Sequence, residues 1–234
     1  MAYLEGKNLV ASYGVVPILH ECSVEVEKGE LAVIVGPNGA GKSTVMRVLL
    51  GMLDATSGSV TLDGKDISML STQDRISLGL AFVPQTKNVF PSMSVEENLQ
   101  MGGFIRQDDI NETIEEVYAL FPILYDKRKQ LAEQLSGGQR QQVAFGRAMM
   151  TKPSIMLLDE PTAGVSPIVM DEIFSNILDV RDAGMAVLMV EQNAQQALNI
   201  ADKGYVLVSG RNEHTGTGKE LINNPEVRKK FLGG

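Results

Sequence analysis

One stretch of sequence, LAVIVGPNGAGKSTVMRVLL, decides the fold, and it runs from Leu31 to Leu50. Its first five residues are all apolar, as in a strand buried on both faces, and its last six have the apolar content of a packed helix. Between them lies a glycine-rich loop that ends in Lys42 and Ser43. Glycines allow backbone N–H groups to close around phosphate oxygens, and the N-terminus of the following helix adds a positive dipole end. The stretch therefore predicts an α/β fold with a phosphate site at the end of a buried strand.

The loop matches the pattern G-x-x-x-x-G-K-[ST], the Walker A loop of nucleotide triphosphatases. In this pattern Lys42 reaches the β- and γ-phosphates, and the Ser43 hydroxyl binds Mg²⁺. The ATP-binding residues expected in the loop are Gly36, Asn38, Gly39, Ala40, Gly41, Lys42, Ser43 and Thr44. A glycine-rich turn without a ligand is the alternative, and the flanking strand and helix argue against it.

Length, charge and cysteine content limit the remaining choices. The chain has 234 residues, which suits one large α/β domain, and its net charge of −8 argues against broad nucleic-acid binding. Cys22 is the only cysteine, so we expect a buried thiol and a reducing compartment. A membrane span needs about 18 consecutive apolar residues, and no apolar run approaches that length. No signal-peptide pattern is visible. We therefore expect any link to a membrane to pass through a partner.

Apolar patterns divide the chain into regions. Alternating residues over 1–30 predict half-buried antiparallel strands. Continuous apolar runs at Leu80–Pro84, Ile155–Leu158 and Met185–Val190 predict buried strands, the last two parallel and covered on both faces, and the tail from Leu221 to Phe231 predicts one short amphipathic helix.

The predicted fold is an α/β P-loop nucleotide triphosphatase core of the RecA-like type, with an N-terminal antiparallel β subdomain and an inserted helical subdomain. We expect a single ATPase domain over 1–234. Within it, 1–87 and 154–234 form the nucleotide-binding core, and 88–153, which have helical periodicity between prolines, form the helical subdomain.

Two carboxylates, Asp159 and Glu160, follow directly after the predicted strand Ile155–Leu158. A carboxylate at the C-terminal end of a strand, beside a phosphate loop, is where Mg²⁺ is held, and this role suits Asp159. Glu160 is then placed to polarise an attacking water as general base. An acidic cap of the following helix is the alternative, and the phosphate loop argues against it.

A second glycine-rich segment, Leu135–Gln139, precedes a predicted helix from Gln139 to Met150. Ser136 can cap this helix, and Gly137 and Gly138 expose backbone N–H groups to an anion. The helix N-terminus would make a second phosphate site, although the chain's own loop already supplies one. By itself the segment indicates an ordinary capped helix rather than a phosphate site.

Together these segments resemble the nucleotide-binding subunit of ABC transporters over essentially the full chain. The phosphate loop, the signature Leu135–Gln139 and the pair Asp159-Glu160 occur in that family's order. The resemblance implies ATP and Mg²⁺ as cofactors, and ATP hydrolysis coupled to transmembrane transport. It also makes Gln85 the Q-loop glutamine, which senses Mg²⁺ and water, and Tyr13 the aromatic that stacks on adenine. A half-buried strand tyrosine is the other interpretation of Tyr13.

The resemblance also implies partners, because two subunits of that family pair head to tail. Ser136, Gly137, Gly138 and Gln139 would then act in trans, on ATP held by the partner. Expected partners are a second ABC ATPase subunit (as hetero- or homodimer), two transmembrane permease subunits, and indirectly a periplasmic substrate-binding protein, with no nucleic acid. The expected location is the cytoplasmic face of the inner membrane. Residues 86–104 would form the docking groove, lined by Val89, Phe90, Met93, Val95 and Leu99, with plain core packing as the alternative.

Two positions depart from the family's pattern. Gln192 stands where a histidine is usual after the Met185–Val190 strand; it can donate a hydrogen bond to a γ-phosphate but cannot titrate. We expect it to keep the sensor role, and a helix-capping segment is the alternative. Ser166 stands at the aspartate position of the D-loop, which puts that inter-subunit contact in question.

The segment Val190–Ala194 and the ending Pro225–Gly234 resemble the ATP-binding subunit of branched-chain (hydrophobic) amino-acid importers, the LivF type. This resemblance implies a membrane-associated ATPase that energises uptake of such amino acids. The expected catalytic residues are Glu160, Lys42, Gln85 and Gln192, and the expected Mg²⁺ ligands are Ser43, Gln85 and Asp159. The alternatives are a transporter ATPase for urea, short amides or lipid, and a soluble ABC ATPase of translation or DNA repair.

Overall fold

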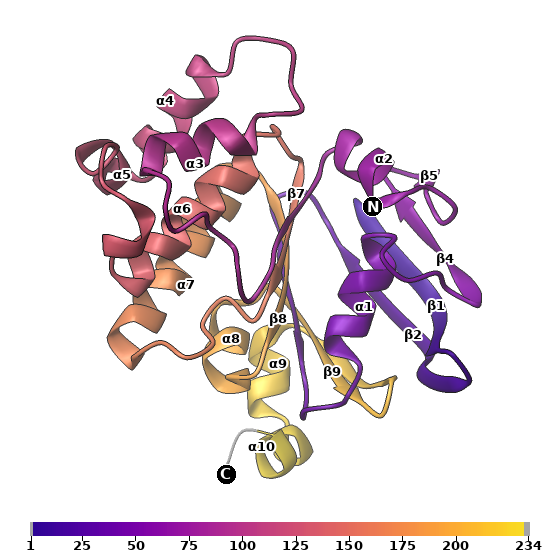
Figure 1. The fold of residues 1–234 in the computed structure, drawn as a ribbon. Coiled ribbons are helices and arrows are strands. Elements are labelled where there is room, and N and C mark those ends of the chain that lie inside the picture. Colours follow the sequence, from indigo (N-terminus) through magenta and orange to yellow (C-terminus); the bar gives the residue numbers. More distant parts are fainter. Residues whose placement is uncertain (1, 232–234) are drawn as a thin grey trace.

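The computed structural model describes residues 2–231. Two sheets organise this part of the chain (Figure 1). The first has the order β2-β1-β4-β5, and its pairs are antiparallel. Its strands are β1 (Leu4–Tyr13), β2 (Val16–Val26), β4 (Ser57–Leu62) and β5 (Lys65–Asp66). The antiparallel strands predicted over 1–30 are therefore confirmed.

The second sheet has the order β10-β9-β3-β8-β7-β6, in which only the β9–β10 pair is antiparallel. Its strands are β3 (Leu31–Val35), β6 (Leu80–Val83), β7 (Ile155–Asp159), β8 (Ala186–Glu191), β9 (Lys203–Val208) and β10 (Arg211–Gly216). Every residue of β3 and β8 is buried, as continuous apolar runs require of parallel strands covered on both faces. The parallel strands predicted from these runs are therefore confirmed.

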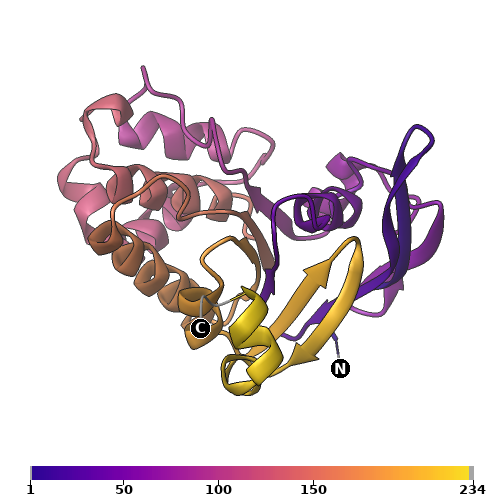
Figure 2. The same cartoon turned by 90° about the horizontal axis from the view of Figure 1, so that it is seen from below.

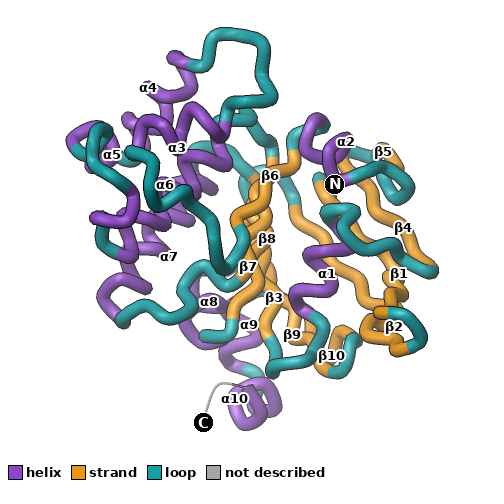
Figure 3. The backbone as a smooth tube through the Cα atoms, viewed as in Figure 1, coloured by secondary structure: helices purple, strands orange, loops and turns teal. Residues whose placement is uncertain are grey.

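The six-stranded sheet separates two cores. On one face, Ala32 and Ile34 of β3 pack with α1 and the antiparallel sheet, and on the other, Val33 and Val35 belong to the core shared with the larger group of helices. Figures 1 and 3 show this sheet in the middle, with most helices on its left and α1 on its right, and Figure 2 shows the same separation from below. The helices are α1 (Lys42–Leu49), α2 (Thr72–Ser77), α3 (Val95–Gly102), α4 (Asn111–Leu120), α5 (Pro122–Asp126), α6 (Gly137–Met149), α7 (Pro167–Asp182), α8 (Ala194–Ile200), α9 (Gly218–Asn223) and α10 (Pro225–Phe231).

Two predicted helices differ from the observed ones. The tail holds two helices, α9 and α10, so the single helix over Leu221–Phe231 is wrong. Asn224 between them is extended (ψ 121°), because a residue before a proline, here Pro225, disfavours the helical conformation. Helix α6 begins at Gly137 rather than Gln139, because Ser136 caps it by accepting the Gln139 backbone N–H.

Cys22 is fully buried, as expected of a lone structural cysteine, and burial raises the pKa of its thiol to about 12. Within residues 2–231, none of the helices combines the length and the apolar character needed to cross a membrane.

Candidate nucleotide-binding and hydrolysis site

The site lies where parallel strands of the central sheet end. The loop after β3 leads to Lys42, the first residue of α1, and β7 ends at Asp159 with Glu160 next to it. Gln85 comes shortly after β6, and Gln192 directly follows β8. Because β3, β8, β7 and β6 are neighbours and parallel, their carboxyl ends form one edge of the sheet, which is where ligands bind in α/β folds.

The phosphate loop depends on two glycines with positive φ. At Gly36 (φ 152°), a Cβ would lie 2.2 Å from the backbone oxygen of Leu207, and at Gly41 (φ 100°) it would lie 2.9 Å from Leu19 Cδ2. Gly41 is also the N-cap of α1 and provides no side chain to cap it. The first N–H groups of α1 are therefore left for a ligand, which is the arrangement that binds phosphate.

The side chain of Lys42 bonds back to the phosphate loop. Its Nζ donates to the carbonyl oxygens of Gly36 (2.9 Å) and Pro37 (3.2 Å). A cavity of about 260 Å³ adjoins it, lined by Ile18, Asn38, Gly39, Ala40, Gly41, Lys42, Ser43, Thr44 and Glu160. The predicted loop residues, apart from Gly36, thus line one cavity together with the predicted base.

The predicted Mg²⁺ ligands and base are brought together in two contacts. Ser43 Oγ donates to Asp159 Oδ1 (3.2 Å), and Gln85 Nε2 donates to Glu160 Oε2 (2.9 Å). Hydroxyl, carboxylate and amide oxygens are the hard ligands that Mg²⁺ prefers, usually with one or two carboxylates and substrate phosphates. Ser43 and Asp159, which contact each other, therefore offer oxygen donors of the kind that suit a magnesium ion, whereas the contact of Gln85 is to Glu160.

Burial shapes the charges of this site. It lowers the pKa of Lys42, while the carboxylates of Glu160, Asp159 and Glu191 oppose that shift. Burial raises the pKa of Asp159, against the Ser43 hydrogen bond and the charges of Arg47 and Lys42. Burial also raises the pKa of Glu160, Lys42 lowers it, and the like charges of Asp159 and Glu191 raise it further. A carboxyl group with a raised pKa is a better proton acceptor, as a general base requires.

Glu160 has an unusual backbone. Its φ is +46°, in the left-handed region that costs a non-glycine residue about 1 kcal/mol. Its N–H donates to the Val190 carbonyl of β8 (2.9 Å), and its own carbonyl accepts the Ala163 N–H (3.1 Å). Such conformations persist where surrounding contacts enforce them, and they cluster at functional sites.

The signature residues lie elsewhere. Ser136 and Gln139 form a capping box, since Ser136 Oγ accepts the Gln139 N–H and Gln139 Oε1 accepts the Ser136 N–H. A Cβ on Gly138 would meet the Glu172 carboxylate of α7 at 2.7 Å. None of the signature residues is among those that line the cavity at the phosphate loop. Within one chain, the structure therefore does not bring the signature to its own phosphate loop.

Tyr13 and Gln192, the two remaining predicted site residues, are exposed. Tyr13 is 43% exposed near the end of β1, and Arg47 of α1 donates to its hydroxyl (2.9 Å). Arg47 was not predicted to take part, although its place one helical turn after Ser43 was visible in the sequence. Gln192 lies in the loop between β8 and α8.

Glu191 was not predicted to take part in the site. Glu191 is 1% exposed at the end of β8. Its two carboxylate oxygens accept hydrogen bonds from Thr162, Gln192 and Asn193. A charged residue that ends an otherwise apolar buried strand was the available signal.

The residues expected to line a docking groove separate into two groups. Val95 and Leu99 are fully buried and Val89 nearly so, so for these three the prediction of a groove is wrong. They lie in the helical core, where Leu99 packs against Gly146 of α6. Phe90 is 37% exposed, and the Arg147 guanidinium lies 4.5 Å from the centre of its ring.

A groove of about 350 Å³ adjoins this region, between the central sheet and the helices α3 and α6. Its lining includes Met52, Phe82, Asn88, Met101 and Arg147. Met52 and Met101 are exposed, which gives the groove an adaptable apolar wall.

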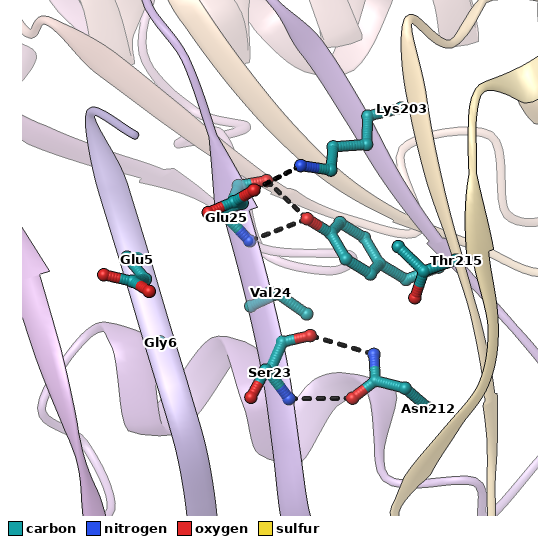
Figure 4. A pocket seen from close by; sticks show the side chains of 9 residues that line it. Glu5, Gly6, Ser23, Val24, Glu25, Lys203, Asn212 and Thr215 are labelled. Carbon is teal, nitrogen blue, oxygen red and sulfur yellow. Dashed lines mark hydrogen bonds and ion pairs between the residues drawn. The ribbon is translucent and has the colours of Figure 1, made fainter. Parts of the chain in front are cut away.

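Another cavity, of about 330 Å³, lies between β2 and the strands β9 and β10 (Figure 4). Several of its polar groups pair with one another: Lys203 pairs with Glu25, the Tyr205 hydroxyl bonds the Glu25 backbone, and Asn212 bonds the Ser23 backbone. These contacts connect β2 to β9 and β10, so the residues around this cavity hold the two sheets together.

A phosphate loop on a parallel sheet, with strand-end carboxylates and a separate glycine signature, defines an ATP-binding cassette ATPase. A family profile described as ABC transporter matches residues 19–163. The BraG protein of Pseudomonas aeruginosa, a high-affinity branched-chain amino acid transport ATP-binding protein, is 45% identical over 95% of this chain and 96% of its own length.

Another relative, the LivF protein of Archaeoglobus fulgidus, is described as a probable branched-chain amino acid transport ATP-binding protein. It is 39% identical, over 97% of each chain. A crystal structure of an ATP-binding cassette of an ABC transporter, in its ADP conformation, superimposes with a TM-score of 0.90 at 30% identity over 100% of both chains. This chain therefore belongs to the ABC transporter ATP-binding family, and it is an ATPase subunit of such a transporter.

Proposed function

We propose that this ATPase energises uptake of branched-chain or other hydrophobic amino acids by an ABC importer. The proposed cargo rests on the similarity to BraG and LivF over nearly the full chain. The ATPase itself does not touch cargo in this interpretation, so specificity would reside in the membrane and substrate-binding partners. Urea, short amides and lipid are the competing cargoes.

Each site residue has a proposed role in hydrolysis. Lys42 and the N–H groups at the start of α1 bind the phosphates, and Tyr13, held by Arg47, stacks on adenine. Glu160 accepts a proton from the attacking water, which Gln85 helps to position. Gln192 donates a hydrogen bond to the γ-phosphate. A magnesium ion held by Ser43, Asp159 and Gln85 would neutralise phosphate charge.

The second half of the site is proposed to come from a partner subunit. Support comes from the signature residues Ser136–Gln139, which form an ordered helix N-terminus away from the chain's own phosphate loop. In a head-to-tail pair this N-terminus would cover the γ-phosphate of the partner's ATP. The pair would be a homodimer or a heterodimer with a related ATPase.

The permease subunits are proposed to dock in the groove that contains Met52 and Met101, with Phe90 at its side. A short amphipathic helix fits such a groove through apolar anchors. Arg147, which lines the groove and also donates to the Asn88 carbonyl (2.9 Å), would link the docked helix to the segment that carries Gln85. The chain would then sit at the cytoplasmic face of the membrane through these partners.

The base assignment is tested by Glu160→Gln, which keeps shape and removes the proton acceptor. We expect the variant to bind ATP with wild-type affinity, to hydrolyse it at least about 100-fold more slowly, and to accumulate as an ATP-bound dimer in size-exclusion chromatography. Rapid turnover by this variant would refute the role of Glu160.

The cargo is tested in the organism of origin. Deleting the gene should abolish uptake of labelled leucine, isoleucine and valine, and the wild-type gene, but not the Glu160→Gln form, should restore it. Loss of urea, amide or lipid transport with intact leucine uptake would contradict the proposed cargo. Recovery of the chain with ribosomes or DNA, rather than with membrane proteins, would contradict the importer itself.

A further inference from the structure

Glu191 is a fully buried carboxylate that joins two loops of the site. It ends β8 and is 1% exposed. Its Oε1 accepts both the backbone N–H (3.0 Å) and the hydroxyl (2.7 Å) of Thr162, which belongs to the turn after β7. Its Oε2 accepts the backbone N–H groups of Gln192 (3.0 Å) and Asn193 (3.4 Å). One side chain therefore bridges the turn that follows Glu160 and the loop that carries Gln192.

The chemistry of this position requires a carboxylate. All four groups that face the two oxygens are donors, so a side chain with two acceptor atoms satisfies them. A glutamine of the same shape would turn its NH₂ group toward two of these donors, and those hydrogen bonds would be lost. Burying a carboxylate is costly, so a residue kept at such a position needs specific donors, as found here.

The bridge acts on a strained turn. Glu160 has φ +46°, and its N–H is held by the Val190 carbonyl of β8 (2.9 Å). Two residues later, Thr162 is held by Glu191, also on β8. The turn that presents the Glu160 carboxylate is therefore fixed to β8 at both ends. Asn193 adds a weaker contact, because its Nδ2 lies 3.4 Å from Thr162 Oγ1.

We infer that Glu191 is a positioning residue for ATP hydrolysis, which holds the turn of Glu160 and the loop of Gln192 in one fixed arrangement. It is not among the residues that line the cavity at the phosphate loop, so it would act through its neighbours. This inference rests on the roles proposed above for Glu160 and Gln192, and it adds to the proposed function a residue that positions both. With this bridge in place, the proton acceptor and the γ-phosphate sensor move as one unit rather than independently.

The test uses the full chain and two variants that weaken the bridge, Glu191→Gln and Thr162→Val. We expect Glu191→Gln to lower kcat about 10- to 100-fold with KM for ATP changed less than about threefold, because misplacement of catalytic groups affects rate more than binding. Thr162→Val should give a smaller loss of the same kind, and Thr162→Ser, which keeps the hydroxyl, should restore most of it.

Tyr205→Phe is the matched control. Tyr205 is also buried, on strand β9 of the central sheet, and its hydroxyl makes two hydrogen bonds to the Glu25 backbone. The control should lower the melting temperature as the bridge variants do, with kcat unchanged. If the control lowers kcat as much as Glu191→Gln does, the effect is one of stability alone, and the positioning role is overturned.

Hydrogen exchange gives a readout that does not depend on turnover. In Glu191→Gln, backbone amides in both segments, 160–165 and 190–195, should exchange at least about tenfold faster, since the bridge joins them. Faster exchange in only one segment, or unchanged kcat, would overturn the inference. Glu160→Gln, assayed in parallel, separates the two claims: if it retains turnover, the proposed function fails, whereas its inactivity with a fully active Glu191→Gln refutes only the bridge.

Discussion

Two helix N-termini of this molecule present glycine-rich segments, and they differ in how their N–H groups are satisfied. Helix α1 begins after Gly41, which offers no side chain to cap it. Helix α6 begins after Ser136, which forms a reciprocal capping box with Gln139. The α1 terminus leaves its donors for a ligand, whereas the α6 terminus is ordered by its own residues.

Their surroundings differ as well. Lys42, Ser43, Asp159 and Glu160 gather at the α1 terminus, which therefore combines phosphate binding with groups for metal and water. At the α6 terminus the ionisable neighbours are the Glu172 carboxylate beside Gly138 and Arg140, which donates to the Leu135 carbonyl. The difference teaches that the residues of one half-site gather at α1, and that the role proposed for the α6 terminus requires a nucleotide supplied from outside its own chain.

The largest expected effect tests this division directly. Lys42→Ala should weaken ATP binding by about 100-fold, because it removes charge-assisted hydrogen bonds to phosphate. Ser136→Arg should leave the affinity of an isolated chain within about twofold, since α6 does not contact its own nucleotide. Titration with a fluorescent ATP analogue measures both. Equal losses in the two variants would contradict the division into two half-sites.

Mixing these two variants, each of which we expect to lack ATPase activity by itself, sharpens the same comparison. In a head-to-tail dimer, a mixed pair holds one site with an intact phosphate loop and an intact signature. A 1:1 mixture should thus recover up to about a quarter of wild-type ATPase activity, since half of the dimers are mixed and each has one working site. Without exchange of sites between chains, the mixture should stay as inactive as its components.

A further prediction concerns Asp159 at the α1 half-site, where one substitution should raise stability and lower the rate of hydrolysis. Burial raises the pKa of Asp159, so its charged form is disfavoured in the folded protein. This lowers the free energy of unfolding at pH values above both the folded and the unfolded pKa of Asp159, hence at pH 7.5. The loss of stability decreases as the pH falls through the folded pKa toward the unfolded one. Asp159→Asn should therefore raise the melting temperature by about 1–3 °C and reduce Mg²⁺-dependent hydrolysis about 100-fold.

The control for this prediction is Asp171→Asn, at an exposed position of α7, which should change neither the melting temperature nor the rate. Differential scanning calorimetry and a steady-state ATPase assay measure the two quantities. A lower melting temperature for Asp159→Asn would show that the hydrogen bond from Ser43 outweighs the burial of the charge.

A smaller effect concerns pH. Because the pKa of Glu160 is raised above its usual 4.5, kcat/KM should fall on the acid side with an apparent pKa above that value. The like charge of Glu191 contributes to the raised pKa, so in Glu191→Gln the acid limb should move to lower pH. A pH–rate profile in buffers of constant ionic strength measures both positions. An acid limb at or below 4.5 would contradict Glu160 as the titrating base.

The smallest effect separates capping from catalysis at α6. Ser136 and Thr217 both form capping boxes, at α6 and α9. Ser136→Ala and Thr217→Ala should each lower the free energy of unfolding by about 1 kcal/mol. Only Ser136→Ala should also lower kcat severalfold, because only that cap is proposed to face ATP. Urea unfolding and ATPase assays compare them, and equal kcat values would reduce Ser136 to a structural cap.

Much of this molecule was predictable from local sequence. The phosphate loop, the strand before it, the helix after it, and the carboxylates after β7 were predicted because each depends on residues adjacent in the chain. The docking groove was only partly predictable: apolar residues at helical spacing over 89–99 fit a groove and a core equally well. The packing of α3 on α6 places Val95 and Leu99 in the core.

The sequence by itself thus determined the class of fold, the phosphate loop and the family, because glycine conformations, strand burial and helix ends follow from short segments. Only the tertiary structure decided that Gln85 donates to Glu160 across 75 positions of the chain, and that Glu191 joins Thr162 to the Gln192 loop. The physical reason is that a contact between distant side chains depends on strand register and on the conformation of two loops at once. Neither can be read from the local pattern of either segment.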